Sequence, residues 1–400
     1  MTRKPLRQAC LVVAATVLAG APARTSAQSS SPTGLEIGAL PVVNFDSDEG
    51  FGYGALAAIY QYGTVGFAPY EWVLRPQVFL TTEGRRDLTL FFDAPYLLPN
   101  GWRLTVFVGT QKHVATPYYG LGNASAYDES LDDEEGANPN FYRFGWRRDG
   151  GTFMLQRPVG GPSLRVLLGG GVQRATVDPV PEDRGTTLYE AHFGADEETS
   201  WTNFVRGGVV WDTRDRESGP TSGTWTELLV QWVDEGLGAD VEYTRWTFTD
   251  RRYLSLADGL VFAHRYLVRG VTEGAPVHDL FNVQSSFEQQ EGLGGASTVR
   301  GVLKNRFVGR GMLVWNAELR WRVADFRVVG RDAHLVLSAF VDHGRVWAES
   351  PQLDELLSDL RRGFGGGARI GLGENFVVAL DVGTSTETGL PFYMGLGYLF

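Results

Sequence analysis

The chain has 400 residues, of which 43% are hydrophobic and 12% aromatic, and it contains 51 glycines. This composition excludes a broadly disordered chain and favours a β-rich fold with tight turns. The formal net charge of −11 becomes −15 when the four basic residues of positions 1–27 are removed. So acidic a chain is not expected to bind nucleic acid.

Residues 1–27 are predicted to form a cleaved signal peptide. Three basic residues precede an apolar stretch that ends near Ala21, and Thr25-Ser-Ala27 supplies small residues for cleavage. Cys10 is the only cysteine, so the mature chain is expected to have no disulfide, no cysteine-ligated zinc and no thiol nucleophile. Residues 28–34 are expected to form a short segment, with no periplasmic domain expected before the first strand.

Apolar and polar residues alternate along most of the mature chain. Leu319 and Trp321 lie on one face of a predicted strand, whereas Glu318, Arg320 and Arg322 lie on the other. Alternation of this kind fits either a soluble sheet or a membrane barrel. The choice between them comes from the lengths of the connections.

Sixteen strands are predicted at residues 35–45, 50–62, 71–82, 86–95, 101–113, 140–156, 164–178, 201–213, 223–235, 240–254, 259–271, 309–323, 333–346, 363–373, 376–385 and 391–400. Every connection after an even-numbered strand is short, and the long ones, 114–139, 179–200, 272–308 and 347–362, all follow odd-numbered strands. This sorting is typical of outer-membrane barrels with periplasmic termini. Residues 35–400 are therefore predicted to form a 16-stranded antiparallel transmembrane β-barrel, integral to a Gram-negative outer membrane.

The last predicted strand ends at the chain terminus. Tyr393, Gly395, Tyr398 and Phe400 fit the C-terminal assembly signal of outer-membrane barrels, in which aromatic residues alternate towards a final Phe. In a soluble protein, a terminal aromatic strand would be an aggregation hazard. These four residues are therefore predicted to form the assembly signal.

Four motifs occur in a characteristic order. They are Tyr119-Gly-Leu-Gly-Asn123, Asp212-Thr-Arg-Asp215 with a following Pro-Thr-Ser-Gly, the segment 294–322 with Val299-Arg-Gly301, and Phe340-Val-Asp-His-Gly-Arg-Val-Trp347. Together with the terminal strand they resemble the BamA/TamA-type outer-membrane assembly superfamily, also called the bacterial surface-antigen family.

This resemblance implies a long loop after the eleventh strand that folds back into the lumen. Val299, Arg300 and Gly301 match the family's loop motif, and Arg300 is expected to meet Glu318 and Asp342 on the inner wall. The residue chemistry agrees, because a carboxylate is expensive on the lipid side and can be paired on the lumen side. Arginine can bridge two carboxylates with its planar fork. The alternative is an ordinary solvated loop arginine.

The resemblance also implies that relatives insert or secrete proteins at the outer membrane. Expected partners are outer-membrane lipid and lipopolysaccharide, unfolded outer-membrane or secreted client proteins, and a separate periplasmic partner in place of the POTRA domains that this chain lacks. A passive pore or small-solute channel is the alternative. The sequence contains no His-x-x-x-His pair and no Gly-x-Ser-x-Gly elbow, so no enzyme, metal or cofactor is expected.

Overall fold

The computed structural model describes residues 33–46, 50–64, 67–96, 98–132, 138, 140–180, 185–286, 292–328, 330–373 and 375–400. The predicted signal peptide lies outside these residues. The strands are β1 (Leu35–Asp46), β2 (Gly50–Gln61), β3 (Trp72–Thr81), β4 (Arg86–Ala94), β5 (Arg103–Pro117), β6 (Arg143–Pro158), β7 (Leu164–Asp178), β8 (Glu198–Trp201), β9 (Phe204–Asp212), β10 (Gly223–Val233), β11 (Tyr243–Ala257), β12 (Leu260–Val271), β13 (Gly311–Val328), β14 (Arg331–Trp347), β15 (Arg361–Leu372), β16 (Phe376–Thr384) and β17 (Phe392–Leu396).

Helices are short and confined to the connections. The two α-helices are α1 (Leu188–Phe193) and α2 (Val277–Leu280), and 3-10 turns occupy Pro99–Gly101, Glu129–Leu131, Glu235–Leu237 and Leu353–Glu355. None of the helices in the described part of the chain is long and apolar enough to cross a membrane.

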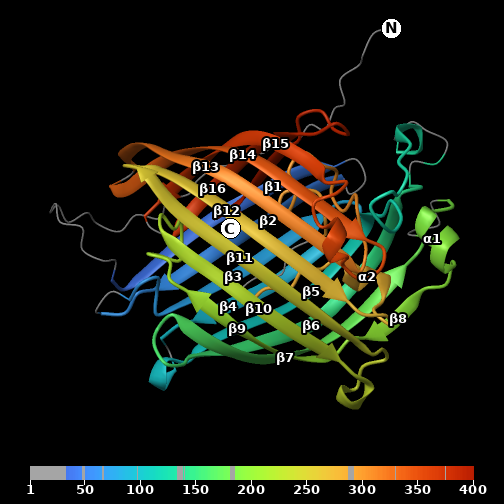
Figure 1. The fold of residues 1–400 in the computed structure, drawn as a ribbon, viewed down its shortest axis with the longest axis horizontal. Helices are drawn as coiled ribbons and strands as arrows, with labels where there is room; N and C mark the ends of the chain where they lie inside the picture. Colours follow the sequence, from blue (N-terminus) through green and yellow to red (C-terminus); the bar gives the residue numbers. More distant parts are fainter. Residues whose placement is uncertain are drawn as a thin grey trace, which may run out of the picture.

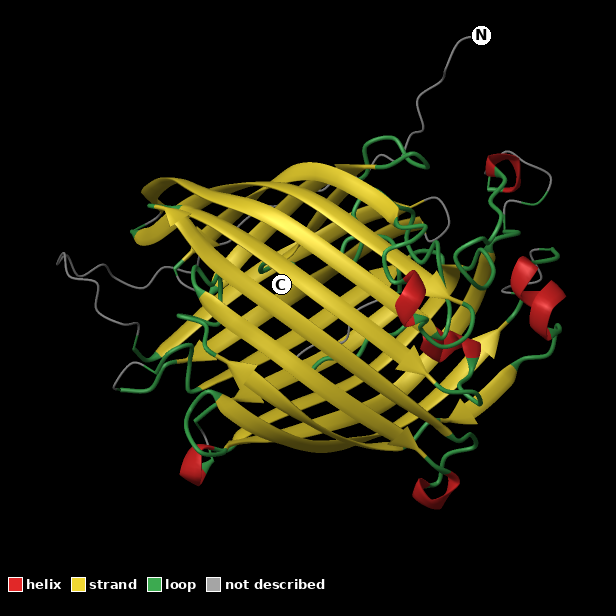
Figure 2. Cartoon of the chain, in the orientation of Figure 1, coloured by secondary structure: helices red, strands yellow, loops and turns green. Residues whose placement is uncertain are grey.

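The strands form one antiparallel sheet that curves around a lumen (Figure 1). Each long strand pairs with its neighbour in the chain, and Figure 2 shows the steep tilt that such a barrel requires. The all-β fold is as predicted, although the structure has seventeen strands and not sixteen.

The additional strand, β8, lies almost wholly in the predicted connection 179–200, directly before the predicted strand 201–213. Both β8 and β9 pair with β7, and residues 202–203 separate them. The side-chain amide of Asn203 donates to the carbonyl oxygens of Leu237 and Gly238 at 3.1 and 3.0 Å, and its oxygen accepts from the backbone N–H of Gln173 at 3.3 Å. These bonds replace regular strand pairing at this point, and β8 becomes separate.

The connections are sorted between the two ends of the barrel. The long ones, 118–142, 179–197, 272–310 and 348–360, all lie at one end, which we call the loop end. At the opposite end, the turn end, the longest connections between described strands are 62–71 and 213–222. The sorting by length that the sequence indicates is therefore present.

Side chains alternate between the lumen and the outside. On β13, Leu319 and Trp321 are 42% and 55% exposed, whereas Glu318 and Arg320 are 1% and 4% exposed. Exposed apolar residues continue around the outer face on other strands, among them Val108, Leu168, Val172, Val209, Trp232, Phe248, Leu337 and Phe364. An apolar outside with a polar inside is the pattern of a membrane barrel.

The last strand is shorter than predicted. It ends at Leu396 and not at Phe400, because the chain turns at Gly397, where φ is +78°. Phe400 then packs with Tyr253, Val261 and Ala263 on the inner wall, and only 5% of it is exposed. Burial of the ring in this apolar cluster outweighs four more residues of edge pairing. The C-terminus accordingly lies within the outline of the barrel (Figure 1).

Candidate functional site in the barrel lumen

The connection 272–310 between β12 and β13, which we call the lumen loop, packs against the inner wall. Its residues Leu293, Val299, Val302 and Phe307 form one buried cluster with wall side chains that include Val314. Val299 and Phe307 are fully buried. Apolar contacts of this kind fix the loop backbone, so the loop can hold a charged side chain in one position.

Arg300 lies at the centre of this contact and is fully buried. Its Nε and Nη2 donate to the two carboxylate oxygens of Asp342 at 2.8 and 3.0 Å, and its Nη1 donates to Glu318 at 2.6 Å. Its guanidinium also stacks on the ring of Phe340, 3.4 Å from the centroid. The structure thus brings together the three charged residues that the sequence singles out.

Arg300 has a third acidic neighbour that the sequence analysis missed. Its Nη1 is 3.2 Å from Asp381 on β16, which is itself held by Arg369 at 2.7 Å. Glu318 in turn accepts from Arg320 at 2.7 Å. We call these six residues, Arg300, Glu318, Arg320, Asp342, Arg369 and Asp381, the ionic cluster. It alternates in charge and spans β13 to β16.

Electrostatics hold Arg300 in its charged form. Burial by itself would lower the pKa of the guanidinium, but the nearby carboxylates of Asp342 and Glu318 outweigh burial and raise it. A buried pair is strongly destabilised when one partner is removed, because the other charge is left without compensation. Loss of one member of the ionic cluster would therefore leave a buried charge unpaired and weaken the attachment of the loop to the wall.

Gly301 sits where no side chain fits. Its φ is +93°, and a Cβ atom there would lie 2.4 Å from the carbonyl oxygen of Thr384 on β16. Its N–H donates to the hydroxyl of Tyr393 at 2.9 Å, and Thr388 donates its hydroxyl to the Gly301 carbonyl. The tip of the lumen loop is therefore bonded to the β16–β17 hairpin.

The four residues of the predicted assembly signal have different surroundings. Tyr393 contacts Gly301, whereas a Cβ on Gly395 would meet nothing within 4 Å. Tyr398 and Phe400 lie past the turn, with their rings 4.7 and 4.9 Å from the guanidinium of Arg320. They do not continue the strand, because both contact the ionic cluster inside the barrel.

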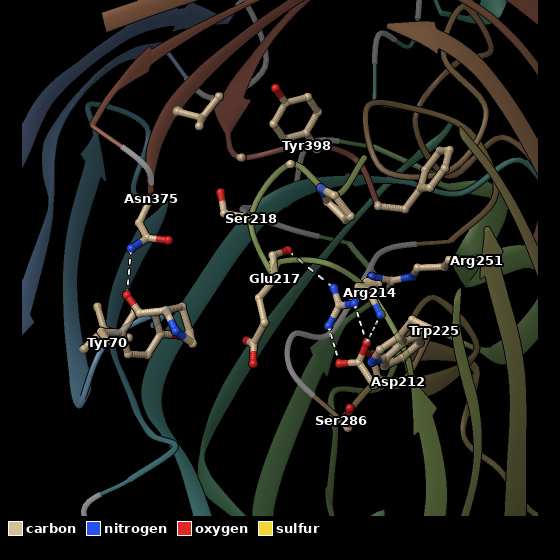
Figure 3. A pocket seen from close by; sticks show the side chains of 18 of the residues that line it. Tyr70, Asp212, Arg214, Glu217, Ser218, Trp225, Arg251, Ser286, Asn375 and Tyr398 are labelled. Atoms are coloured by element: carbon tan, nitrogen blue, oxygen red, sulfur yellow. Dashed lines mark hydrogen bonds and ion pairs between the residues drawn. The ribbon is translucent and has the colours of Figure 1, made fainter. Parts of the chain in front are cut away.

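A cavity of about 250 Å³ lies in the lumen next to this C-terminal tail (Figure 3). The inward-folded turn between β9 and β10 supplies Arg214, which pairs with Asp212 at 2.8 Å, and Glu217, which pairs with Arg103 at 2.8 Å. Tyr398 closes the cavity from the tail side. Because these charges are paired with one another, the cavity is a lined space without an evident reactive group.

No metal site emerges from the residues that the structure describes, since no three His, Cys, Asp or Glu side chains gather closely enough there. The described residues form a tilted barrel, apolar outside, with a long loop held in the lumen by a buried ionic cluster. These features define a transmembrane β-barrel with a lumen-seated loop.

The comparisons place this barrel in a family. The Omp85 superfamily domain matches residues 75–397, and the chain therefore belongs to the Omp85 superfamily. Its barrel is an outer-membrane β-barrel, as the sequence predicts. No curated protein matches the chain.

Solved structures share the fold at low sequence identity. BamA from Haemophilus ducreyi lacking POTRA domains 1-3 superposes with a TM-score of 0.53 at 13% identity, over 92% of this chain and 69% of that chain. CdiB from Escherichia coli gives 0.54 at 12% identity, over 91% of this chain. This chain spans 61% of the length of that CdiB.

Proposed function

We propose that this protein inserts or translocates polypeptides at the outer membrane, with its turn end and both termini in the periplasm. Unfolded outer-membrane or secreted proteins are its clients, and a separate periplasmic partner delivers them. Membership of the Omp85 superfamily supports this proposal, as does the fold shared with BamA and CdiB. The observation that carries it is the state of the seam between the first and last strands.

The seam is weakly closed. β17 pairs with β16 over five residues, from Phe392 to Leu396, and no backbone pairing joins it to β1 among the residues described. β1 is 12 residues long, and within the described part of the chain it pairs with β2 alone, so its other edge has no strand partner there. Unpaired edges of this kind are templates for another strand. A client strand is the occupant that we propose.

The lumen loop is placed to control the seam. Gly301 is bonded to Tyr393 of β17, and Arg300 beside it holds the ionic cluster. Separation of Arg300 from the ionic cluster would therefore detach the lumen loop from the inner wall and from the β16–β17 hairpin in one step. We propose that Val299, Arg300 and Gly301 act in this way, with Glu318 and Asp342 as the wall partners.

The test is to delete the gene in its own host and to quantify the outer-membrane proteins and lipids. We expect selective loss of particular barrels or surface proteins, which also identifies the clients. Wild-type protein should restore them. An unchanged inventory, combined with large steady conductance of the purified wild-type barrel in planar bilayers, would contradict the proposal and establish a passive pore.

A Cys pair across the seam gives a second test, because the wild-type chain has no cysteine after Cys10. One Cys replaces Ala39 on β1 and the other replaces Leu396 on β17. We expect inefficient disulfide formation in the resting protein and loss of complementation once the bond is forced. Rapid, complete crosslinking without loss of function would show that opening between β1 and β17 is not needed for function.

A further inference from the structure

Four arginines line one side of the lumen near α2, and we call them the arginine wall. They are Arg148 on β6, Arg206 on β9, Arg245 on β11 and Arg269 on β12. Arg206, Arg245 and Arg269 are 7%, 1% and 0% exposed. In the sheet register, Arg206 and Arg245 flank the same residue of β10, Gln231. The wall is thus built from widely separated parts of the chain.

The wall holds a piece of polypeptide by its backbone. Residues 279–284 of the lumen loop lie on it. Arg245 donates through Nη2 to the carbonyl oxygen of Asp279 at 2.8 Å. Arg269 donates through Nη1 to the carbonyl oxygens of Leu280 and Asn282 at 2.7 and 3.1 Å. Contacts with main-chain carbonyls do not depend on which side chains the bound segment carries.

Side chains of the same segment complete the contact. The carboxylate of Asp279, 3% exposed, lies 3.7 Å from the guanidinium of Arg245 and 3.8 Å from that of Arg148. Arg206 donates to the side-chain oxygen of Gln284 at 2.5 Å. The segment therefore offers the wall one carboxylate and several neutral oxygens.

The arginine wall has more positive charge and more hydrogen-bond donors than residues 279–284 engage. Nε of Arg148, Arg245 and Arg269, and Nη1 of Arg245, have no hydrogen-bond partner among the described residues. Beyond Asp279, the acidic side chain that acts on the wall is Glu227, near Arg206. Three of these cations are buried and the side chain of Arg148 is 12% exposed, so placing them against so little negative charge is costly, and apolar packing would anchor a loop more cheaply.

We propose that the arginine wall is a binding site for unfolded polypeptide with acidic residues, and that residues 279–284 occupy it as an intramolecular ligand. This inference rests on the proposed function, because it needs a client that enters the lumen. Arginine forks recognise carboxylates and carbonyl oxygens, which every extended acidic chain presents. A client segment with more carboxylates than residues 279–284 would use the free donors and displace the loop segment.

The test uses the full-length protein in detergent micelles and a labelled peptide with the sequence of residues 277–286, Val-His-Asp-Leu-Phe-Asn-Val-Gln-Ser-Ser. The Asp279→Ala variant weakens the internal ligand. We expect this variant to bind the peptide about tenfold more tightly than wild type, because an internal competitor lowers the apparent affinity of the wild type. The affinity should fall as salt is added. A peptide with Asn in place of its Asp should bind less tightly.

Second variants separate the wall from general damage. Adding Arg245→Gln to Asp279→Ala should abolish the gain in affinity. Adding Arg147→Gln should leave the gain in affinity intact, because the Arg147 side chain is 60% exposed. Its neighbour Arg148, which belongs to the arginine wall, is unchanged in this variant. Folding of each variant is checked by its heat-dependent electrophoretic mobility.

If folded Asp279→Ala protein binds the peptide no better than wild type, the inference is overturned and the wall serves only as a loop anchor. That result would leave the proposed function standing, because the gene-deletion experiment measures client loss independently. Conversely, peptide binding with an unchanged outer-membrane inventory would contradict the proposed function alone.

Discussion

Arg320 joins the end of the chain to the ionic cluster: its Nη2 donates to the backbone oxygen of Phe400 at 3.1 Å, and its Nε donates to Glu318 at 2.7 Å. Since Glu318 also binds Arg300, Phe400 is linked to the lumen loop through Arg320 and Glu318. The state of the loop and the position of the tail are therefore coupled through side chains that lie on one strand.

Phe400→Ala should destabilise the barrel. The Phe400 ring is 5% exposed, and truncation of such a ring typically costs about 3 kcal/mol or more. We expect a lower unfolding temperature in detergent, followed by electrophoretic mobility. The control is Phe392→Ala, because Phe392 is 42% exposed and faces away from the lumen cluster. Equal effects of the two substitutions would show that the tail is not seated in solution.

Arg300→Ala should release the lumen loop. The substitution leaves Asp342 and Glu318 buried without their cation, a change that costs about 3–5 kcal/mol. We expect raised conductance in planar bilayers and faster proteolysis within the loop. Arg300→Lys should recover little, because an ammonium cannot bridge two carboxylates as a guanidinium does.

Arg310→Ala is the matched control for that prediction. Arg310 pairs at 2.7 Å with Glu349, whose side chain is 71% exposed, and a pair of this kind contributes less than about 1 kcal/mol. Its conductance should equal that of wild type. If Arg300→Ala also conducted like wild type, the lumen loop would not be held by the ionic cluster.

Gly301→Ala should have an effect close to that of Arg300→Ala without changing any charge. Its Cβ would press on the Thr384 backbone, and its φ of +93° is unfavourable for alanine by about 1–3 kcal/mol. Gly389→Ala, where a Cβ would meet nothing within 4 Å, is the control. The protease sensitivity of the lumen loop distinguishes the two variants. If the loop of Gly301→Ala stayed protected, the close fit of Gly301 against Thr384 would not be required to hold it.

Acid should loosen the lumen loop at α2. Burial lowers the pKa of His278 to about 4; the carboxylate of Asp279 opposes this shift, and Arg148 and Arg245 add to it. A released His278 would titrate near 6.5, so the seated loop gains its full stability above that pH and loses it as pH falls towards 4. Asp279 stays ionised in this range because its pKa is about 2.

The measurement is conductance between pH 7.5 and 5. Wild-type conductance should rise as the pH falls, and His278→Gln, which cannot take up a proton there, should show a flatter profile. A wild-type profile that is flat over this range would exclude His278 as the group responsible.

Much of the fold follows from the sequence because the alternation has a period of two and the membrane imposes it. Most strand boundaries agree within a few residues, for example β7 at Leu164–Asp178. The largest boundary error is at β13, which extends to Val328 and not to residue 323, whereas the final strand ends four residues early and leaves the sheet at Gly397. Alternation continues through Tyr398 and Phe400, but burial in the lumen depends on Tyr253 and Arg320, which are distant in sequence.

The part of the candidate site that a sequence motif covers can be predicted from the sequence, and the rest cannot. Arg300, Glu318 and Asp342 come together as the resemblance implies. Asp381 was overlooked, although a lone carboxylate in an otherwise apolar strand is a signal for the lumen face. The partners of Asp279 could not be assigned, because no local pattern tells which wall residues a long loop will meet.

Two buried loop residues that the inner face of the barrel holds by charge have opposite signs: Asp279 is an anion among arginines, and Arg300 is a cation among carboxylates. A voltage across the bilayer acts on each charge with about 2.3 kcal/mol per 100 mV for full crossing, but in opposite directions. The electrical forces on this pair therefore cancel along the membrane normal. A voltage across a planar bilayer therefore exerts no net force on this pair, whereas competition by a ligand or a change in protonation acts on one member of the pair at a time.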